Sequence, residues 1–330
     1  MKIKTVLSLI IVTLITGVYF MSEMIVYADE ESLVAKGENR NSTISLKADS
    51  ISPLESLEQT VKQYDAQSFD KSFDIEIFES DTCTKSTLYD YIVSVVMSEM
   101  PYTFEKEALK AQAVATRTYT LKLFEDESRH KYASVCTDPS HCSAALDREA
   151  FIRKYGEEAY NKAYDAVSAV VDETDGVVIK YNDELCTAVY HSSSYGATES
   201  SYNLWGSYTP YLLSVKTPET LPPQSVSVNA SAINAGSANQ ISVKYNDTGR
   251  CSHIVVNDNE IKSSKLRSML GLKSSKFELK NKGNELVFTV YGYGHGIGMS
   301  QYGANEMAKS GCDYKEILTH YYTGVEVVNM

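Results

Sequence analysis

The chain has no internal repeat of fixed period in its 330 residues, which excludes solenoids and propellers. It is also poor in basic residues. Its 31 Lys and Arg stand against 43 Asp and Glu, and the net charge of -12 argues against nucleic acid as a partner. Tryptophan occurs once, whereas tyrosine occurs 24 times. A hydrophobic fraction of 43% predicts a globular protein with a substantial core.

A long apolar run is missing too. The apolar stretch 6–21 spans about 16 residues, short of the roughly 20 that cross a bilayer. Lys2 and Lys4 precede it, and V-Y-A at 26–28 resembles a signal-peptidase site, so a cleaved signal peptide and an uncleaved anchor both fit. Both place the remaining chain outside the cytoplasm. We expect a signal or anchor at 1–28, a flexible polar tether at 29–69 and a folded domain at 70–330. Within that domain we expect a subdomain excursion at 218–290, whose first part, 218–239, is rich in Ser, Pro and Ala and forms a surface excursion.

The stretch 86–122 predicts two helices that are separated at Met100-Pro101. Ser86 or Thr87 is a suitable N-cap for the first helix. Apolar side chains then follow at the spacing of one buried helical face, at Leu88, Ile92, Val95 and Val96. Because proline disfavours helix at the residue before it, we expect the first helix to end at Glu99. The second helix should begin near Glu105 or Lys106.

Glu99 is the next position on the apolar face of the first helix. Burial of a carboxyl group disfavours its charged form and raises its pKa, which suits a general acid. The alternative is a side chain that bends out to water at the helix end. The spacing alone leaves both interpretations open.

The order of the remaining patterns indicates an α+β fold. Helical patterns cluster early, at 86–122 and 148–170, and strand patterns dominate later. A hairpin is expected at Asn182-Asp183, with a second strand over 185–190 that leads into a polar loop. We expect the helical segment to pack with mixed or antiparallel strands and to form a cleft with them.

Two cysteines and two histidines lie within thirteen residues of the chain. The donors His130, Cys136, His141 and Cys142 would complete a tetrahedral Cys2His2 set suited to structural Zn²⁺. The competing interpretation is a Cys136–Cys142 disulfide, which is natural outside the cytoplasm. The remaining four cysteines cannot be paired from their spacing.

Glycines alternate at 292, 294, 296 and 298 in a block that ends in Ser300 and Gln301. No Gly-Lys-Ser/Thr follows, so a Walker loop is excluded, and there is no Gly-x-Ser-x-Gly elbow. Alternating glycines imply that the backbone closely approaches something. With Ser300 as an N-cap, Ser300 and Gln301 would face a cleft. A tight packing turn is the alternative.

Three blocks of sequence resemble a known family. The first is S-E-M-P at 98–101, followed by E-A-L-K-A-Q-A-V-A-x-R-T-Y at 107–119. The second is Y-H-S-S-S at 190–194, and the third is H-G-I-G-M-S-Q-Y-G-A at 295–304. In this order, and over about 74–328, they resemble the stage II sporulation protein D family. Its members are peptidoglycan lytic transglycosylases, with relatives described as amidase enhancers.

The resemblance implies that Glu99 is the catalytic acid in a sporulation enzyme that acts during engulfment. Such an acid protonates the glycosidic oxygen between N-acetylmuramic acid (MurNAc) and N-acetylglucosamine (GlcNAc) of a glycan strand. The resulting carboxylate takes the proton of the muramic C6 hydroxyl, which attacks its own C1. A 1,6-anhydro end results, and no water is consumed.

The resemblance also implies substrate-binding roles for residues of the three blocks. Arg117 would bind the muramic lactyl carboxylate that is freed when the stem peptide is removed, because an arginine fork suits a carboxylate. The alternative is a solvated helix arginine. The other residues with an implied binding role are Tyr190, His191, Ser192, Tyr211, His295, Ser300 and Gln301. The family often has Tyr-x-Lys at Tyr211, and the leucine found at 213 puts that contact in doubt.

The partners implied by the resemblance are a stem-peptide amidase, stage II sporulation protein P, and a membrane protein M. It also favours an N-terminal anchor in the cell membrane over a cleaved signal. Some clostridial relatives carry a similar C-T-D-x-x-H-C loop, as at 136–142. The alternative function is a cell-wall-binding module that activates an amidase without catalysis of its own.

Overall fold

The computed structural model describes residues 68–79, 82–125, 133–139, 141–233 and 241–330. All of them belong to one compact unit that begins at Lys62. The expected signal or anchor at 1–28 and nearly all of the tether at 29–69 lie outside the described residues. Among the residues that are described, no helix is both long and apolar enough to cross a membrane.

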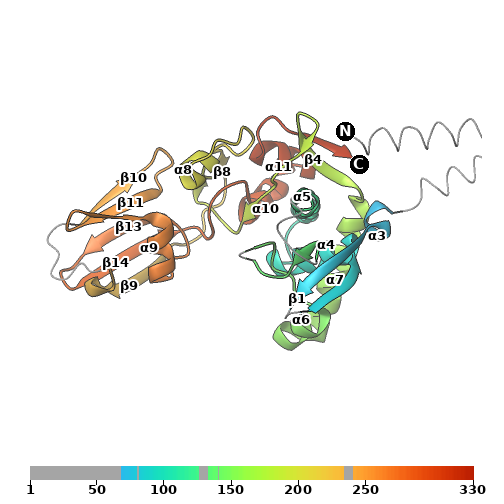
Figure 1. The fold of residues 1–330 in the computed structure, drawn as a ribbon, viewed down its shortest axis with the longest axis horizontal. Coiled ribbons are helices and arrows are strands. Elements are labelled where there is room, and N and C mark those ends of the chain that lie inside the picture. The colour runs from blue at the N-terminus through green and yellow to red at the C-terminus, as the bar shows by residue number, and fades with distance from the viewer. Residues whose placement is uncertain (1–67, 80–81, 126–132, 140, 234–240) are drawn as a thin grey trace, which may run out of the picture. The chain divides into compact units, whose positions relative to one another are not determined.

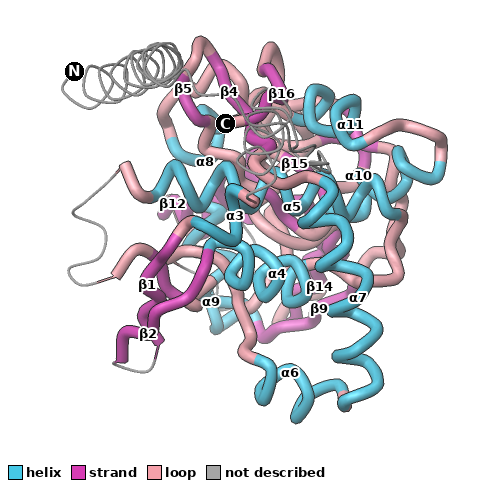
Figure 2. The backbone as a smooth tube through the Cα atoms, turned by 90° about the vertical axis from the view of Figure 1, so that its right-hand side faces the viewer, coloured by secondary structure: helices cyan, strands magenta, loops and turns pink. Residues whose placement is uncertain are grey.

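The fold is α+β, as expected, with helices and several small sheets (Figures 1 and 2). The helices are α3 Phe69–Ser72, α4 Leu88–Glu99, α5 Lys106–Leu123, α6 Arg148–Tyr155, α7 Glu157–Glu173, α8 Ser201–Trp205, η1 Ala230–Ile233, α9 Ser263–Leu270, α10 Gln301–Lys309 and α11 Tyr314–Tyr321. The strands are β1 Asp74–Glu79, β2 Thr82–Thr87, β3 Val135–Cys136, β4 Val177–Tyr181, β5 Glu184–Leu185, β6 Tyr190–His191, β7 Gly196–Ala197, β8 Lys216–Thr217, β9 Gln224–Asn229, β10 Ile241–Tyr245, β11 Cys251–Val256, β12 Asn259–Lys262, β13 Lys276–Asn281, β14 Glu285–Tyr291, β15 Met299–Ser300 and β16 Glu326–Asn329.

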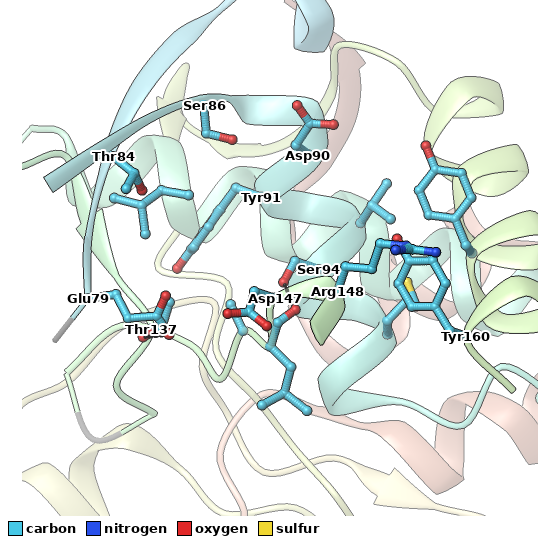
Figure 3. A pocket seen from close by; sticks show the side chains of 16 residues that line it. Glu79, Thr84, Ser86, Asp90, Tyr91, Ser94, Thr137, Asp147, Arg148 and Tyr160 are labelled. Atoms are coloured by element: carbon cyan, nitrogen blue, oxygen red, sulfur yellow. Dashed lines mark hydrogen bonds between the residues drawn. The ribbon is translucent and has the colours of Figure 1, made fainter. Parts of the chain in front are cut away.

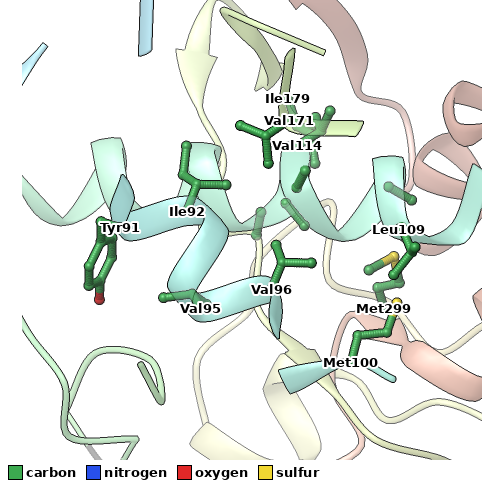
Figure 4. Packing of buried hydrophobic residues seen from close by; sticks show 14 of the residues in the cluster. Tyr91, Ile92, Val95, Val96, Met100, Leu109, Val114, Val171, Ile179 and Met299 are labelled. Atoms are coloured by element: carbon green, nitrogen blue, oxygen red, sulfur yellow. The ribbon is translucent and has the colours of Figure 1, made fainter. Parts of the chain in front are cut away.

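Helix α5 is the centre of the larger hydrophobic core. It packs against α4, α7, α10, α11 and β4. Alanines at 108, 111, 113 and 115 are fully buried, and their small side chains let neighbouring elements approach the helix closely. Figure 4 shows Ile92 and Val96 of α4 packing with Val114 of α5 in this core.

The predicted ends of the two central helices are confirmed. Thr87 caps α4 and accepts a hydrogen bond from the backbone N–H of Asp90. Met100 is extended, so α4 ends at Glu99, immediately before Pro101. Helix α5 begins at Lys106, as the sequence predicts.

Two local expectations were wrong. The single helix expected over 148–170 is divided into α6 and α7 by Gly156. Glycine readily adopts the φ of +92° found there, but an α-helix cannot continue through a residue with that φ. The hairpin at Asn182-Asp183 forms, with φ of 50° and 66° at the two turn residues. Its second strand, however, stops at Leu185, and Tyr190–His191 form a separate strand parallel to β15.

The stretch 218–290 contains a second hydrophobic core. Strands β13, β14 and β9 form one sheet and β10, β11 and β12 another, and α9 contacts β11 and β12 (orange in Figure 1). Ile254, Leu266, Leu286 and Phe288 are fully buried there. The first part of this stretch, 218–239, was expected to be a surface excursion, and residues 224–229 of it form β9.

Candidate active site

Glu99 lies in a pocket of about 400 Å³ at the C-terminal end of α4. Helices α6 and α7 form one wall, and the start of α10 forms another. The pocket is lined by residues 97–103 together with Phe151, Tyr155, Ala159, Ser192, Gln301 and Tyr302. Of the predicted site residues, the structure therefore brings Ser192 and Gln301 beside Glu99, and their role in binding stays a prediction.

The Glu99 carboxyl group is largely removed from water. Burial raises its pKa, whereas hydrogen bonds from the Ala144 backbone and from the Gln301 side chain act in the opposite direction. The Ala144 N–H lies 3.2 Å from Glu99 Oε1. The alternative that Glu99 bends out to water is thus not what the structure shows, and a carboxyl group with a raised pKa suits proton donation.

A ladder of amide side chains links Glu99 to the central helix. Gln301 Nε2 donates to Gln112 Oε1 over 3.3 Å, and Gln112 Nε2 donates to Thr116 Oγ1 over 3.2 Å. Gln112 is completely buried and Gln301 is 3% exposed, so both side chains are fixed by packing. Sequence reasoning did not select Gln112, although a buried amide in an alanine-rich helical face was the available signal.

Glu99 also lines a smaller pocket of about 110 Å³. The other residues of that pocket are Tyr119, Cys142, Ser143, Val189, Tyr190 and His295. The Tyr190 and Ser143 hydroxyl groups are 3.0 Å apart, and burial together with the neighbouring Glu99 raises the pKa of Tyr190. Tyr190 and His295 were predicted from the sequence, whereas Tyr119 and Ser143 were missed.

The His295 ring is fixed by backbone groups on both sides. Its Nδ1 accepts a hydrogen bond from the Ile297 N–H at 3.0 Å, and the backbone of Tyr190 also bonds it. Burial lowers the pKa of His295 to about 4. The ring is therefore neutral near pH 7 and can contribute a fixed dipole, but no positive charge, to the pocket that it shares with Glu99.

His191 and Ser300 do not face the pockets, contrary to the expectation that they contact substrate. His191 is 4% exposed, and its two ring nitrogens lie 3.1 Å from the Ile297 carbonyl and 2.5 Å from Ser194 Oγ. Ser300 is completely buried and donates to Glu219 over 2.6 Å. Its predicted N-cap role is confirmed, because its hydroxyl accepts a hydrogen bond from the Gly303 N–H. Both side chains make buried contacts that fix the glycine-rich segment 292–300.

Arg117 is the clearest correction, because its guanidinium is completely buried in an ion pair. Nε lies 2.8 Å and 3.0 Å from the two Asp70 carboxylate oxygens, and Nη2 lies 2.5 Å from Oδ2. Nη1 donates to the Val177 carbonyl over 3.1 Å. With both side chains 0% exposed, no substrate carboxylate can reach Arg117. The residue ties α5 to α3 and β4.

Tyr211 lines neither of the two Glu99 pockets described here. Its hydroxyl accepts a hydrogen bond from the Thr187 N–H at 2.9 Å, and its ring packs on Tyr181. The predicted substrate contact of Tyr211 is therefore not supported, in keeping with the missing lysine at 213. The side chain instead holds the segment between β5 and β6.

The alternating glycines are explained by close approaches. A Cβ at Gly298 would lie 2.0 Å from the Val189 carbonyl oxygen, and one at Gly296 would lie 2.6 Å from the Arg250 guanidinium carbon. Both glycines also have positive φ, which other residues rarely adopt. The block is thus a packing turn, and it delivers His295 and Gln301 to the Glu99 pockets on either side.

Three of the four predicted metal donors come together beside the site. The donor atoms of Cys136, His141 and Cys142 all lie within 4.8 Å of one another, with 3.5 Å and 3.8 Å from His141 Nδ1 to the two sulfurs. Zn–S of about 2.3 Å and Zn–N of about 2.0 Å at tetrahedral angles require about 3.6 Å between sulfur and nitrogen. The set fits zinc, and the two sulfurs are not bonded to each other. His130 lies outside the described residues.

Comparison with known proteins identifies the family. The SpoIID family model, described as a stage II sporulation protein, matches residues 79–181. Stage II sporulation protein D of Bacillus subtilis (strain 168) is 33% identical over 253 residues, covering 73% of this chain and 74% of that protein. The protein named amidase enhancer from the same organism is 29% identical over 303 residues, covering 71% of this chain and 40% of that protein. The chain belongs to the stage II sporulation protein D family.

Proposed function

We propose that this protein is a lytic transglycosylase that cleaves the bond between MurNAc and GlcNAc in peptide-stripped peptidoglycan strands. The observation that carries the proposal is that Glu99 is the one carboxylate among the described residues that line its two pockets. Most glycoside hydrolases need a second carboxylate about 5–10 Å away to act as nucleophile or to activate water. A lytic transglycosylase needs only one carboxyl group.

The single carboxyl group acts twice. Neutral Glu99 donates its proton to the glycosidic oxygen, the bond from that oxygen to C1 of the muramic acid breaks, and an oxocarbenium-like centre forms. The Glu99 carboxylate then takes the proton of the C6 hydroxyl, whose oxygen bonds to C1. Glu99 ends protonated again, and atoms and charge balance without water.

Zinc would be held by Cys136, His141 and Cys142, with His130 as the expected fourth ligand. When bound, it would supply folding energy to the loop and no chemistry to the sugar. The contact that supports a link to activity is the hydrogen bond from Ala144, two residues after Cys142, to the Glu99 carboxyl group. A loop held in this way fixes the proton donor.

The cellular setting is also a proposal. We infer a domain outside the cytoplasm, tethered to the cell membrane through residues 1–28, with the anchor favoured over a cleaved signal by the family resemblance. An amidase that removes stem peptides, stage II sporulation protein P, and the membrane protein M would be its partners. The family is a sporulation family, and engulfment is the step at which we place the activity.

A second candidate function is the activation of an amidase by a wall-binding domain without its own catalysis. The relative named amidase enhancer supports it. The partly buried Glu99 favours the enzyme, because a binding module has no need of a carboxyl group with a raised pKa in its pocket.

Glu99→Gln distinguishes these two functions. Glutamine keeps the shape of the side chain and has no proton to donate, so cleavage should fall by at least about 100-fold while the melting temperature and glycan affinity are kept. Glu105→Gln is the matched control, since Glu105 is an exposed carboxylate that precedes α5. If Glu99→Gln retains more than a few per cent of wild-type turnover, the enzyme proposal is wrong. It is also wrong if the wild type shows no cleavage and Glu99→Gln activates an amidase as well as the wild type does.

A further inference from the structure

A second pocket, of about 260 Å³, lies on the side of α4 toward its N-terminal end (Figure 3). Its walls come from β1, β2, α4, the segment 145–148 and α7. Thr137 and Asp147 line this pocket, whereas Cys142 and Ser143, which lie between them in the sequence, line the smaller Glu99 pocket. No role has been assigned above to this pocket.

The second pocket neighbours the larger Glu99 pocket. Met97 lines both. Along α4, Asp90 of the second pocket precedes Met97, and Glu99 follows it. Along α7, Ala159 lines the Glu99 pocket and its neighbour Tyr160 lines the second one. Both pockets thus lie beside α4 and α7 and share Met97, which makes them candidate sites for different sugars of one chain-like ligand.

The lining of the second pocket has the composition of a sugar site. Tyr160 lines the pocket, with the Arg148 guanidinium over its ring at 5.3 Å from the centroid and the Tyr164 ring stacked on it at 5.9 Å. Figure 3 shows Arg148 beside this ring. The hydroxyl and carboxyl groups around it belong to Thr84, Ser86, Asp90, Ser94, Thr137 and Asp147. Tyrosine side chains beside hydrogen-bond acceptors and donors match the apolar and hydroxyl surfaces of a pyranose.

The charge of the pocket distinguishes between the two sugars of the strand. Glu79, Asp90 and Asp147 place three carboxylates around it. Arg148 is the one cation among its described lining residues, and it is paired with Glu157 at 3.3 Å. A peptide-stripped MurNAc carries a lactyl carboxylate, which these groups repel, whereas GlcNAc is neutral.

We propose that the second pocket binds a GlcNAc unit of the strand that is cut at Glu99, and that it rejects MurNAc. The identity of the strand rests on the proposed function. Because the two sugars alternate, one sugar held at a fixed place sets the register of the whole strand against Glu99. The acidic pocket would therefore help to present the MurNAc side of a bond to the acid.

The test measures binding, so it does not depend on cleavage. In a Glu99→Gln background, GlcNAc oligomers are titrated by calorimetry. Tyr160→Ala should weaken their binding about tenfold, while Tyr160→Phe stays within about twofold of the parent. Tyr208→Ala, at an exposed tyrosine outside both pockets, is the matched control and should leave the affinity unchanged.

A charge variant tests the rejection of MurNAc. Glu79→Gln/Asp90→Asn/Asp147→Asn should keep its affinity for GlcNAc oligomers and bind peptide-stripped strands several-fold more tightly at low salt. Unchanged affinity for stripped strands overturns the proposal, as does parent-like binding by Tyr160→Ala. A loss by Tyr160→Ala that is confined to strands with stem peptides would show a peptide site instead. If the wild-type protein does not cleave the strands, that result counts against the proposed function alone.

Discussion

The buried ion pair between Asp70 and Arg117 predicts a large loss of stability when either partner is replaced. Three nitrogen–oxygen contacts of 2.5 to 3.0 Å join the two side chains, and both are 0% exposed, so water screens neither charge. Removal of one partner leaves the other buried and unpaired. The expected loss in the free energy of unfolding is about 3–5 kcal/mol for Arg117→Met or for Asp70→Leu.

For a domain of this size, each kcal/mol lowers the melting temperature by about 2–4 °C, so either single substitution should lower it by roughly 6–20 °C. The double variant Asp70→Leu/Arg117→Met removes both charges and should recover most of the loss, because apolar pairs replace buried ion pairs well. Calorimetric or denaturant unfolding of the four proteins gives the coupling energy. Additive losses, or a stable Arg117→Met that only binds stripped strands more weakly, would refute the structural role.

Three further predictions concern Glu99, the metal donors and Gly298. Because burial raises the pKa of Glu99 in the folded protein, cleavage should fall as the pH rises through that pKa. The free energy of unfolding of the wild type should also decline relative to that of Glu99→Gln as the pH rises above about 4.5, the pKa of Glu99 in the unfolded chain. If the free energies of the two proteins change in parallel across that range, the prediction is wrong. Purified protein should hold about one zinc per chain. Cys142→Ser or a chelator should lower both the melting temperature and the cleavage rate. A metal-free protein with a Cys136–Cys142 disulfide and sensitivity to reductant would instead support the disulfide. Gly298→Ala should destabilise by at least about 3 kcal/mol, since its Cβ meets the Val189 carbonyl, whereas Gly311→Ala, with positive φ and open space, should lose only about 1–2 kcal/mol; equal losses in thermal unfolding would exclude the steric argument.

Two local signals placed Glu99 at the end of a buried helical face, and the family resemblance then implied its catalytic role. The helical period places it on a buried face, and Pro101 ends the helix immediately after it. The partner of Arg117 could not be predicted in this way, because Asp70 lies 47 residues earlier and meets it only in the tertiary fold. A buried arginine and a solvated one look alike in a helical pattern.

The polar residues near the C-terminus show the same limit. Ser300 and Gln301 are neighbours in one motif, yet Ser300 points back to Glu219 and Gln301 points to the Glu99 pocket. Which neighbour faces the cleft depends on the turn that begins α10 and not on the motif. Likewise, the second core within 218–290 depends on the pairing of β9 with β14, two strands that are far apart in the sequence.

The fate of water in the reaction tests the central claim most directly. Wild-type protein is incubated with peptide-stripped glycan strands in water labelled with heavy oxygen, and the new ends are analysed by mass spectrometry. A Glu99 that acts as acid and then as base predicts 1,6-anhydro ends that are lighter than hydrolysis products by one water molecule and carry no heavy oxygen. New reducing ends that contain heavy oxygen would contradict the account, because a second group would then have to activate water.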